Sequence, residues 1–408
     1  MKSIFSTFKG LHKEGTPLDF LATWKKTFDK ASEREVALFQ KMYSDKWCDY
    51  ATPQMSLTAE GLVAKHRLRF MATLLGDEAP TPLRRSDGFD IWTGEIPRVG
   101  HKFPMTAREY RKIMEIYENP RLKEPDKVKA IEKELRGQLE AAYLGCKDVM
   151  DYILLNAFSN WGVAQFKPSL NNPGGREYEV DYLMPEENKL VSAFAWTTAN
   201  TKAGKFVPVQ ILATICSELR NRGIEPGEIL MSQDLYFWLL NDPTTRLLAH
   251  GQDKQAQTVK KSEFEALLAE NEIPNITVIT RKMAIDVDGK RQSVEPWDHN
   301  FIGIKPAGKI AEIQPAIEDN ELMEEDNVDY MNAGNGIRIA KWRTGESTSQ
   351  VSAEFTQGSA RMIPVINEIG QIVCLQVRGF EEAKEIPEGK MFFTKNEYTA
   401  QSAALARI

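Results

Sequence analysis

The chain contains 408 residues, 42% of them hydrophobic and 27% charged, which is enough for a sizeable core and two or three domains or subdomains. A formal net charge of −6 at pH 7 argues against nucleic acid or an acidic membrane surface as the main partner. The four cysteines have no CxxC spacing and no apolar run is long enough to cross a bilayer. We therefore expect buried free thiols in a soluble intracellular protein, without a disulfide framework or a zinc site.

The first fifty residues have the character of an arm rather than of a core. Thr16-Pro17 is expected to begin a short helix that ends near Lys30. Ser32 and Glu35 have capping-box spacing, which predicts a second helix through Trp47. Two amphipathic helices ahead of any core suggest a segment that packs on something else.

Residues 51–104 are rich in proline and glycine and lose helical periodicity. Their most extended parts are Arg67–Leu75 and Phe89–Val99, on either side of a polar tip at Gly76–Gly88. A long two-stranded excursion without a covering helix is unusual in a compact monomer. Either another subunit covers this extended loop, or it is an ordinary hairpin of the same subunit's sheet.

The stretch 125–161 is predicted to be one long helix around which the chain is organised. Apolar residues recur there at steps of three and four, as in Val128, Ile131, Leu135 and Leu139. Gly137 and Gly145 weaken a helix, and no second heptad segment of similar length follows, so we prefer a core spine helix to a coiled coil. A shorter helix capped at Thr106 precedes it.

Between residues 206 and 311 the pattern becomes α/β and indicates a compact subdomain. Pro208 and Ser232 are expected to start helices that end near Gly223 and Asn241, and Asp288-Gly289 indicates a hairpin. The remaining predicted elements are strands at Glu228–Met231, Ile276–Thr280 and Phe301–Lys305 and a helix at Lys261–Glu270.

The run Glu312–Tyr330 has eight acidic residues and no basic one. Its default interpretation is a solvated charged strap, because charge runs are usually hydrated. The strands expected at Ile337–Trp342, Ala353–Phe355 and Ile372–Val377 should return to the spine helix.

No pattern of catalytic residues is evident. None of the five histidines lies in a nucleophile elbow, a zinc-binding helix or a metal-ligand spacing, and Asp298-His299 is best explained as a surface turn. Gly334-Asn335-Gly336 lacks the third glycine of a dinucleotide fingerprint. Asp286 and Asp288 lack the distal glutamate of a calcium loop. The sequence therefore argues against an enzyme and predicts no catalytic, cofactor or metal site.

The order of parts, from arm to returning strands, resembles the major capsid proteins of tailed bacteriophages with the Hong Kong 97-type fold. It most resembles the lambda-like major capsid protein E family. Ile91–Val99 resembles the family's segment that leaves the extended loop, and Thr197–Glu225 resembles its approach to the axial subdomain. Ile337–Trp342, Glu354-Phe355 and Met362–Pro364 resemble its closing peripheral strands. The resemblance covers about residues 50–380.

The resemblance implies an α+β fold with six parts. These are an N-terminal arm (1–50), an extended loop (51–104), a peripheral domain (105–205) with the spine helix (125–161), an axial domain (206–311), return strands of the peripheral domain (312–380) and a C-terminal tail (381–408).

It also implies a structural protein that self-assembles through hexamers and pentamers into the icosahedral capsid of a virion around double-stranded DNA. The implied partners are further copies of the chain, a separate scaffold protein, a portal and a decoration protein, with DNA contacted weakly on the inner surface. Assembly would occur in the host cytoplasm, without a membrane or a cofactor. The alternatives are an encapsulin-like shell that encloses cargo proteins and a cytoplasmic enzyme with an unrecognised site.

Arg84 and Arg85, at the tip of the extended loop, are candidate inter-subunit residues, because an arginine fork can hold a carboxylate bidentately at an interface. A solvated turn is the alternative. Their expected partners in a neighbouring subunit are the acidic residues Glu318, Asp319, Glu321, Glu324, Glu325 and Asp326.

Overall fold

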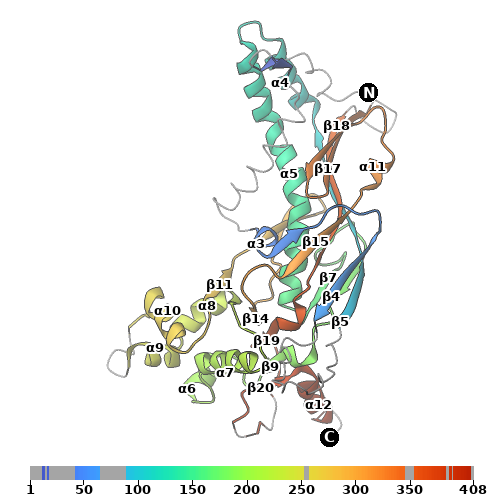
Figure 1. Ribbon diagram of the computed structural model, residues 1–408. Coiled ribbons are helices and arrows are strands. Elements are labelled where there is room, and N and C mark those ends of the chain that lie inside the picture. The colour runs from blue at the N-terminus through green and yellow to red at the C-terminus, as the bar shows by residue number, and fades with distance from the viewer. Residues whose placement is uncertain are drawn as a thin grey trace, which may run out of the picture. The chain divides into compact units, whose positions relative to one another are not determined.

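The computed structural model describes residues 12–13, 16–17, 42–64, 89–251, 257–344, 353–382, 386–387 and 389–405. These residues divide into two compact units (Figure 1). The first unit takes the described residues of Met1–Ala59, Thr93–Tyr152 and Glu312–Val365. The second unit takes those of Glu60–Trp92, Ile153–Ala311 and Ile366–Ile408.

The predicted spine helix is present as α5 (Glu124–Phe158). Its residues up to Tyr152 belong to the first unit, and the remaining residues belong to the second. Its apolar stripe is buried, and Val128 and Leu139 are at most 1% exposed. The helix ends three residues before Trp161, where the sequence placed its end, because Trp161 and Gly162 both have positive φ (49° and 82°). The preceding helix, α4 (Ala107–Glu118), begins at the predicted Thr106 cap.

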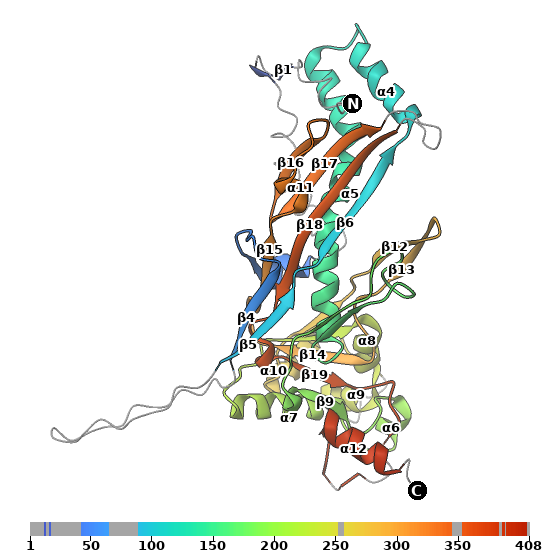
Figure 2. The ribbon, with the colours of Figure 1, turned by 90° about the vertical axis from the view of Figure 1, so that its right-hand side faces the viewer.

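The first unit contains a six-stranded sheet of order β16-β17-β18-β15-β3, with β6 also paired to β18. Its strands are β3 (Cys48–Tyr50), β6 (Arg98–Met105), β15 (Ala311–Ala316), β16 (Asp329–Gly334), β17 (Ile337–Thr344) and β18 (Ala353–Val365). Arg361 pairs with both Arg98 of β6 and Ala316 of β15, so these two strands lie on opposite sides of β18. Figure 2 shows β18 between β6 and β17. The short helix α3 (Tyr43–Trp47) leads into β3.

One face of this sheet packs closely on α5. A Cβ atom at Gly358 of β18 would lie 2.1 Å from the carbonyl oxygen of Ala142, so only glycine allows this contact. On the helix, a Cβ atom at Gly145 would lie 2.0 Å from His101 Cε1. The His101 Nε2 atom lies 3.1 Å from the same Ala142 oxygen, and burial lowers the pKa of His101. The absence of a side chain at Gly145 therefore makes room for the His101 ring of β6.

The second unit contains a six-stranded sheet of order β11-β10-β14-β19-β9-β20. Its strands are β9 (Lys189–Ser192), β10 (Glu228–Ser232), β11 (Ile276–Ile279), β14 (Phe301–Lys305), β19 (Val373–Gln376) and β20 (Phe392–Thr394). Its helices are α6 (Thr198–Lys202), α7 (Pro208–Asn221), α8 (Gln233–Asn241), α9 (Pro243–His250), α10 (Lys261–Glu270) and α12 (Lys395–Leu405). Side chains of α7, α8 and α10 form one apolar core with those of β10, β14 and β19.

Three two-stranded sheets accompany these elements, in addition to the short β1 (His12–Lys13) and β2 (Thr16–Pro17) pair. They are β4 (Thr58–Ala64) with β5 (Phe89–Glu95), β7 (Val163–Phe166) with β8 (Tyr178–Asp181), and β12 (Met283–Val287) with β13 (Lys290–Val294). The β12–β13 turn at Asp288-Gly289 confirms the predicted hairpin. All four cysteines are free and buried, as predicted, and burial raises the pKa of Cys146 and Cys374 to about 12.

One local prediction is wrong, because Thr16-Pro17 forms strand β2 rather than the start of a helix. Phe89–Val99 is extended, as predicted, but it is divided between β5 and β6, because Pro97 lacks the N–H that a continuous ladder requires and the Ile96 N–H donates to the carbonyl of Leu57. The other predicted loop strand, Arg67–Leu75, lies outside the described residues.

The sheet of the second unit extends beyond the range 206–311. Strand β14 pairs with β19, β19 pairs in parallel with β9, and β9 pairs with β20. The range 381–408, expected to be a tail, supplies the edge strand β20 and the helix α12. Strands β18 and β19 do return to the spine helix, as expected, since Cys374 Sγ donates to the Phe158 carbonyl over 3.0 Å.

Candidate functional site

The arginines that make ion pairs in the first unit lie on the sheet face turned away from α5, here called the strap face. Side chains alternate along a strand, and the contacts of His101 and Gly358 with α5 define the opposite face. Arg98 on β6, Arg361 on β18 and Arg338 on β17 therefore belong to the strap face. The register places Arg98 opposite Arg361 and Arg338 opposite Ser359.

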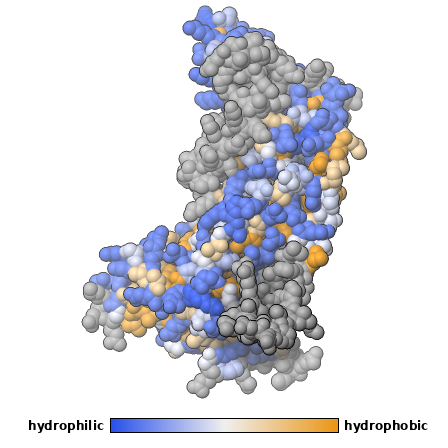
Figure 3. Space-filling view, in the orientation of Figure 1, coloured by the Kyte–Doolittle hydropathy of each residue, from blue (hydrophilic) through white to orange (hydrophobic). Residues whose placement is uncertain are grey.

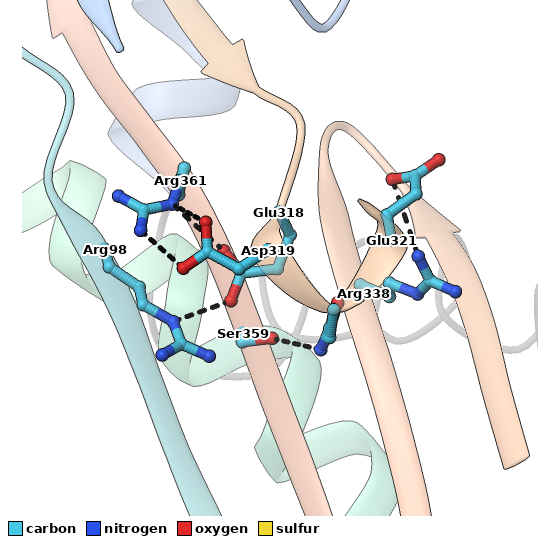
Figure 4. A network of polar contacts seen from close by, with 8 residues as sticks. Arg98, Glu318, Asp319, Glu321, Arg338, Ser359 and Arg361 are labelled. Atoms are coloured by element: carbon cyan, nitrogen blue, oxygen red, sulfur yellow. Dashed lines mark hydrogen bonds and ion pairs between the residues drawn. The ribbon is translucent and has the colours of Figure 1, made fainter. Parts of the chain in front are cut away.

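Residues 317–328, here called the acidic strap, follow β15 and contain the short helix α11 (Asp319–Leu322). Glu318 is only 1% exposed. Arg98 Nε donates to Glu318 Oε1 over 2.8 Å, and Arg361 Nε lies 3.8 Å from Glu318 Oε2 (Figure 4). Two arginines from neighbouring strands thus hold one buried carboxylate.

Asp319 makes a two-point contact with Arg361. Arg361 Nη2 lies 2.6 Å from Asp319 Oδ2, and Arg361 Nε lies 3.1 Å from Asp319 Oδ1. These hydrogen bonds hold the pKa of Asp319 below its usual range and raise the pKa of Arg361. Next in sequence, Asn320 Nδ2 donates to Ser359 Oγ over 3.3 Å.

Arg338 holds the far end of the acidic strap. Its guanidinium bonds to Glu324, and its Nη1 atom lies 3.8 Å from Glu321 Oε2. The same group lies over the ring of Tyr330, 4.6 Å from its centroid. Three arginines therefore bind four strap carboxylates, a network with both exposed and buried partners.

A pocket of about 370 Å³ lies beside this network, lined by Arg98, Val99, Gly100, His101, Lys102, Gln357 and Ser359. Lys102 Nζ lies 5.2 Å from the centroid of the Phe355 ring. Neither Lys102 nor the terminal nitrogens of Arg98 have a carboxylate partner within the described residues. The pocket is therefore a cationic hollow next to an anionic strap.

The candidate residues predicted from the sequence fall into three groups. Glu318, Asp319, Glu321 and Glu324 are paired with arginines of their own chain, so the acidic strap is not simply solvated as expected. The reason is the alternation of β6, β17 and β18, which presents arginines to it. Glu325 and Asp326 are exposed, and Arg84 and Arg85 lie outside the described residues.

The partners Arg98, Arg338 and Arg361 were missed by sequence reasoning. The available signal was an arginine in each of two predicted extended segments, Arg98 in Phe89–Val99 and Arg338 in Ile337–Trp342, whereas Arg361 lies beyond the predicted strand Ala353–Phe355. Arg98 and Glu318 are 220 positions apart, however, and no local pattern links them.

The described residues contain few other chemical groupings. His299 Nε2 lies 2.5 Å from Glu295 Oε2 and its Nδ1 atom lies 3.9 Å from Asp234 Oδ2, so this imidazole meets two carboxylates rather than a nucleophile. Gly334-Asn335-Gly336 is the turn between β16 and β17, with positive φ at all three residues. No cluster of three or more potential metal ligands occurs among the residues that the structure describes.

The exposed large apolar side chains among the described residues include several on α8, α9 and the acidic strap. On the face in Figure 3 the described surface is mainly hydrophilic, with hydrophobic residues in separate spots. Leu322 and Met323, in the acidic strap, are 55% and 80% exposed. None of the described helices combines the length and apolar character needed to cross a membrane.

Comparisons with known proteins identify a shared fold. No family model matches the chain, and no curated protein matches it in sequence. The structure is similar to a protein of an Escherichia coli CFT073 prophage that is described as its capsid protein, with 12% identity and a TM-score of 0.53. That similarity covers 86% of this chain and 98% of the prophage protein.

Two further solved structures are similar at lower TM-scores. A phage-related protein from Bordetella bronchiseptica RB50 has 12% identity, a TM-score of 0.44 and coverage of 86% of this chain and 98% of its own. The virus-like particle from Pyrococcus furiosus has 11% identity, a TM-score of 0.39 and coverage of 88% and 100%. The lambda-like branch stays a prediction. The chain has the α+β Hong Kong 97-type fold that its sequence predicted.

Proposed function

We propose that this chain is a structural protein, the major capsid protein of a tailed bacteriophage, which self-assembles into an icosahedral shell around double-stranded DNA. The observation that carries the proposal is the shared fold with the prophage protein, which extends over 86% of this chain and nearly all of the other. The strap face adds support, because it offers charged groups of both signs in fixed positions.

The parts of the chain take the following roles in this proposal. The ranges 105–205 and 312–380 form the peripheral domain, and the range 206–311 forms the axial domain near the centre of hexamers and pentamers. The extended loop lies across a neighbouring subunit, and the N-terminal arm reaches another. A separate scaffold protein, a portal and a decoration protein are further partners, and packaged DNA touches only the inner surface through weak phosphate contacts.

Electron microscopy of the protein expressed with its scaffold tests the proposal. We expect closed shells, or the hexamers and pentamers from which they form. Discrete monomers under every condition, with no shells, capsomers or tubes, would contradict the proposal. They would favour the alternative of a cytoplasmic enzyme with an unrecognised site. Shells that purify with cargo proteins and form without a portal would favour the encapsulin-like alternative.

Arg84 and Arg85 remain proposed inter-subunit residues, directed at the acidic strap of a neighbour. The pairing of Glu318 and Asp319 within their own chain leaves Glu325 and Asp326 as the more accessible partners. Each exposed pair contributes only about 0–1 kcal/mol, but a shell repeats it at every interface. Arg84→Glu with Arg85→Glu should leave the subunit folded by circular dichroism and impair assembly more at low salt than at high. Wild-type shell yield at every salt concentration would make these arginines ordinary surface charge.

A further inference from the structure

The pocket beside the acidic strap presents positive charge that its own chain does not neutralise. Arg98 is held by Glu318 through Nε, and Figure 4 shows its terminal nitrogens directed away from the strap carboxylates. Lys102, four residues along the same strand, is on the same face and lies over the Phe355 ring. Glu318 thus orients Arg98, and Lys102 lies against an aromatic ring on the same face.

The shape of the pocket follows from the residues between these cations. Gly100 separates Arg98 and Lys102, and a Cβ atom there would lie 3.0 Å from the Gly358 carbonyl oxygen. The missing side chain leaves a hollow, and the polar side chains of Gln357 and Ser359 line it from β18. A hollow with two cations and polar neutral groups suits a carboxylate or a phosphate.

The surroundings distinguish these two ligands. A nucleic acid carries a line of phosphates, and the acidic strap lies directly beside the pocket, held there by Glu318 on Arg98. That strap would repel the flanking phosphates, whereas a single acidic side chain can enter alone. The net charge of −6 makes further copies of this chain a source of acidic side chains.

We propose that this pocket binds an aspartate or glutamate side chain from a second copy of the chain, with Lys102 and Arg98 as the binding cations. The proposal rests on the proposed function, since it requires neighbouring copies. The strap face would then carry one half of an electrostatic contact between subunits.

Zero-length carbodiimide coupling of assembled shells tests the proposal, because it joins a lysine amine only to a carboxylate in contact with it. Shells assembled from mixed 14N and 15N chains distinguish cross-links between copies from those within one. We expect a Lys102 amide to an acidic residue of a differently labelled copy. Lys102→Arg keeps the positive charge but has no primary amine for carbodiimide coupling, so this cross-link should be lost.

Charge reversal provides the second test. Lys102→Glu should raise the concentration needed for assembly by about tenfold or more, because it sets like charges together. Lys133→Glu, at an exposed lysine on α5, is the matched control and should assemble as wild type. Circular dichroism and urea unfolding show whether each variant folds.

The outcomes separate the two proposals. If wild-type protein forms no shells or capsomers, the proposed function fails. If it forms shells but Lys102→Glu assembles normally and Lys102 couples to no other copy, only the pocket proposal fails. Coupling of Lys102 to a scaffold peptide, or loss of bound duplex DNA in Lys102→Glu without an assembly defect, would also overturn it.

Discussion

The two six-stranded sheets are stabilised in different ways. In the second unit, helices and strands share one apolar core, and every residue of β14 is buried. In the first unit, one sheet face packs on α5, while the strap face is covered through arginine–carboxylate contacts. The second unit therefore depends on buried apolar area, and the strap face of the first unit depends on charge.

This difference has consequences for assembly. Burial of apolar surface contributes about 25 cal/mol per Å² and depends little on salt, whereas exposed ion pairs contribute about 0–1 kcal/mol each and are screened. A contact made of charged groups can be exchanged for an equivalent contact with another copy at small cost. We therefore expect the second unit to determine whether the chain folds, and the strap face to respond to salt, pH and neighbours.

The largest expected effect is in the apolar core. Phe264 on α10 is 1% exposed, and Phe264→Ala should lower the free energy of unfolding by about 3–5 kcal/mol, since it leaves a cavity. Phe237 on α8 is 50% exposed, so Phe237→Ala is the matched control and should cost far less. Guanidinium unfolding measures the effect, and hydrogen exchange locates it in the second unit. Equal losses from the two variants would refute a stability determined by this core.

A comparable effect is expected in the first unit from a buried ion pair on the α5 face. Lys341 Nζ lies 3.3 Å from Glu354 Oε1, both side chains are 1% exposed, and burial lowers the pKa of Lys341. Glu354→Ala should cost about 3–5 kcal/mol, because it leaves a buried ammonium without that carboxylate. The double variant Lys341→Met with Glu354→Leu should recover most of this loss. No recovery in urea unfolding would show that Lys341 is needed for more than this pair.

Much of the fold could be predicted from local pattern. The apolar spacing of α5 placed its start within one residue, and the capping box at Thr106 and the turn at Asp288-Gly289 are both present. Trp161 continues the spacing but lies beyond the helix, where its ring packs on Phe301 with centroids 4.9 Å apart. Periodicity alone does not contain that long-range contact.

Only the acidic half of the site could be predicted from the sequence, because local pattern does not contain long-range contacts. The acidic residues of the strap are contiguous in sequence, whereas their partners Arg98, Arg338 and Arg361 come from three separate strands. The same holds for β9 and β20, which join the second sheet from outside 206–311. Strand pairing over such separations depends on packing, which the sequence does not display locally.

The two glycines of α5 differ in their surroundings, so alanine substitutions at them should have opposite effects on stability. No atom lies within 4 Å of a Cβ at Gly137, so Gly137→Ala should stabilise by about 1 kcal/mol through helix propensity. At Gly145 the new methyl would overlap His101 and displace its hydrogen bond to Ala142, so Gly145→Ala should cost about 1–3 kcal/mol. Thermal unfolding measures both changes. Stabilisation by both would show that His101 moves aside freely.

The smallest expected effect is at the exposed part of the strap network. Asp319 is 53% exposed, so its contact with Arg361 should contribute about 0–1 kcal/mol, and Asp319→Asn should expose the acidic strap to slightly faster hydrogen exchange. Because the pKa of Asp319 is lowered in the folded chain, the contribution is fully present above the ordinary aspartate pKa and is lost as the pH falls through the lower, folded value. The hydrogen-exchange rates of wild type and variant should therefore converge in acid, and also in high salt at pH 7.

The control is Glu325→Gln, at an exposed strap carboxylate without an ion pair in the described structure, and it should change neither the pH profile nor the salt profile. A difference between wild type and Asp319→Asn that persists in acid and in high salt would mean that packing, rather than charge, holds the strap.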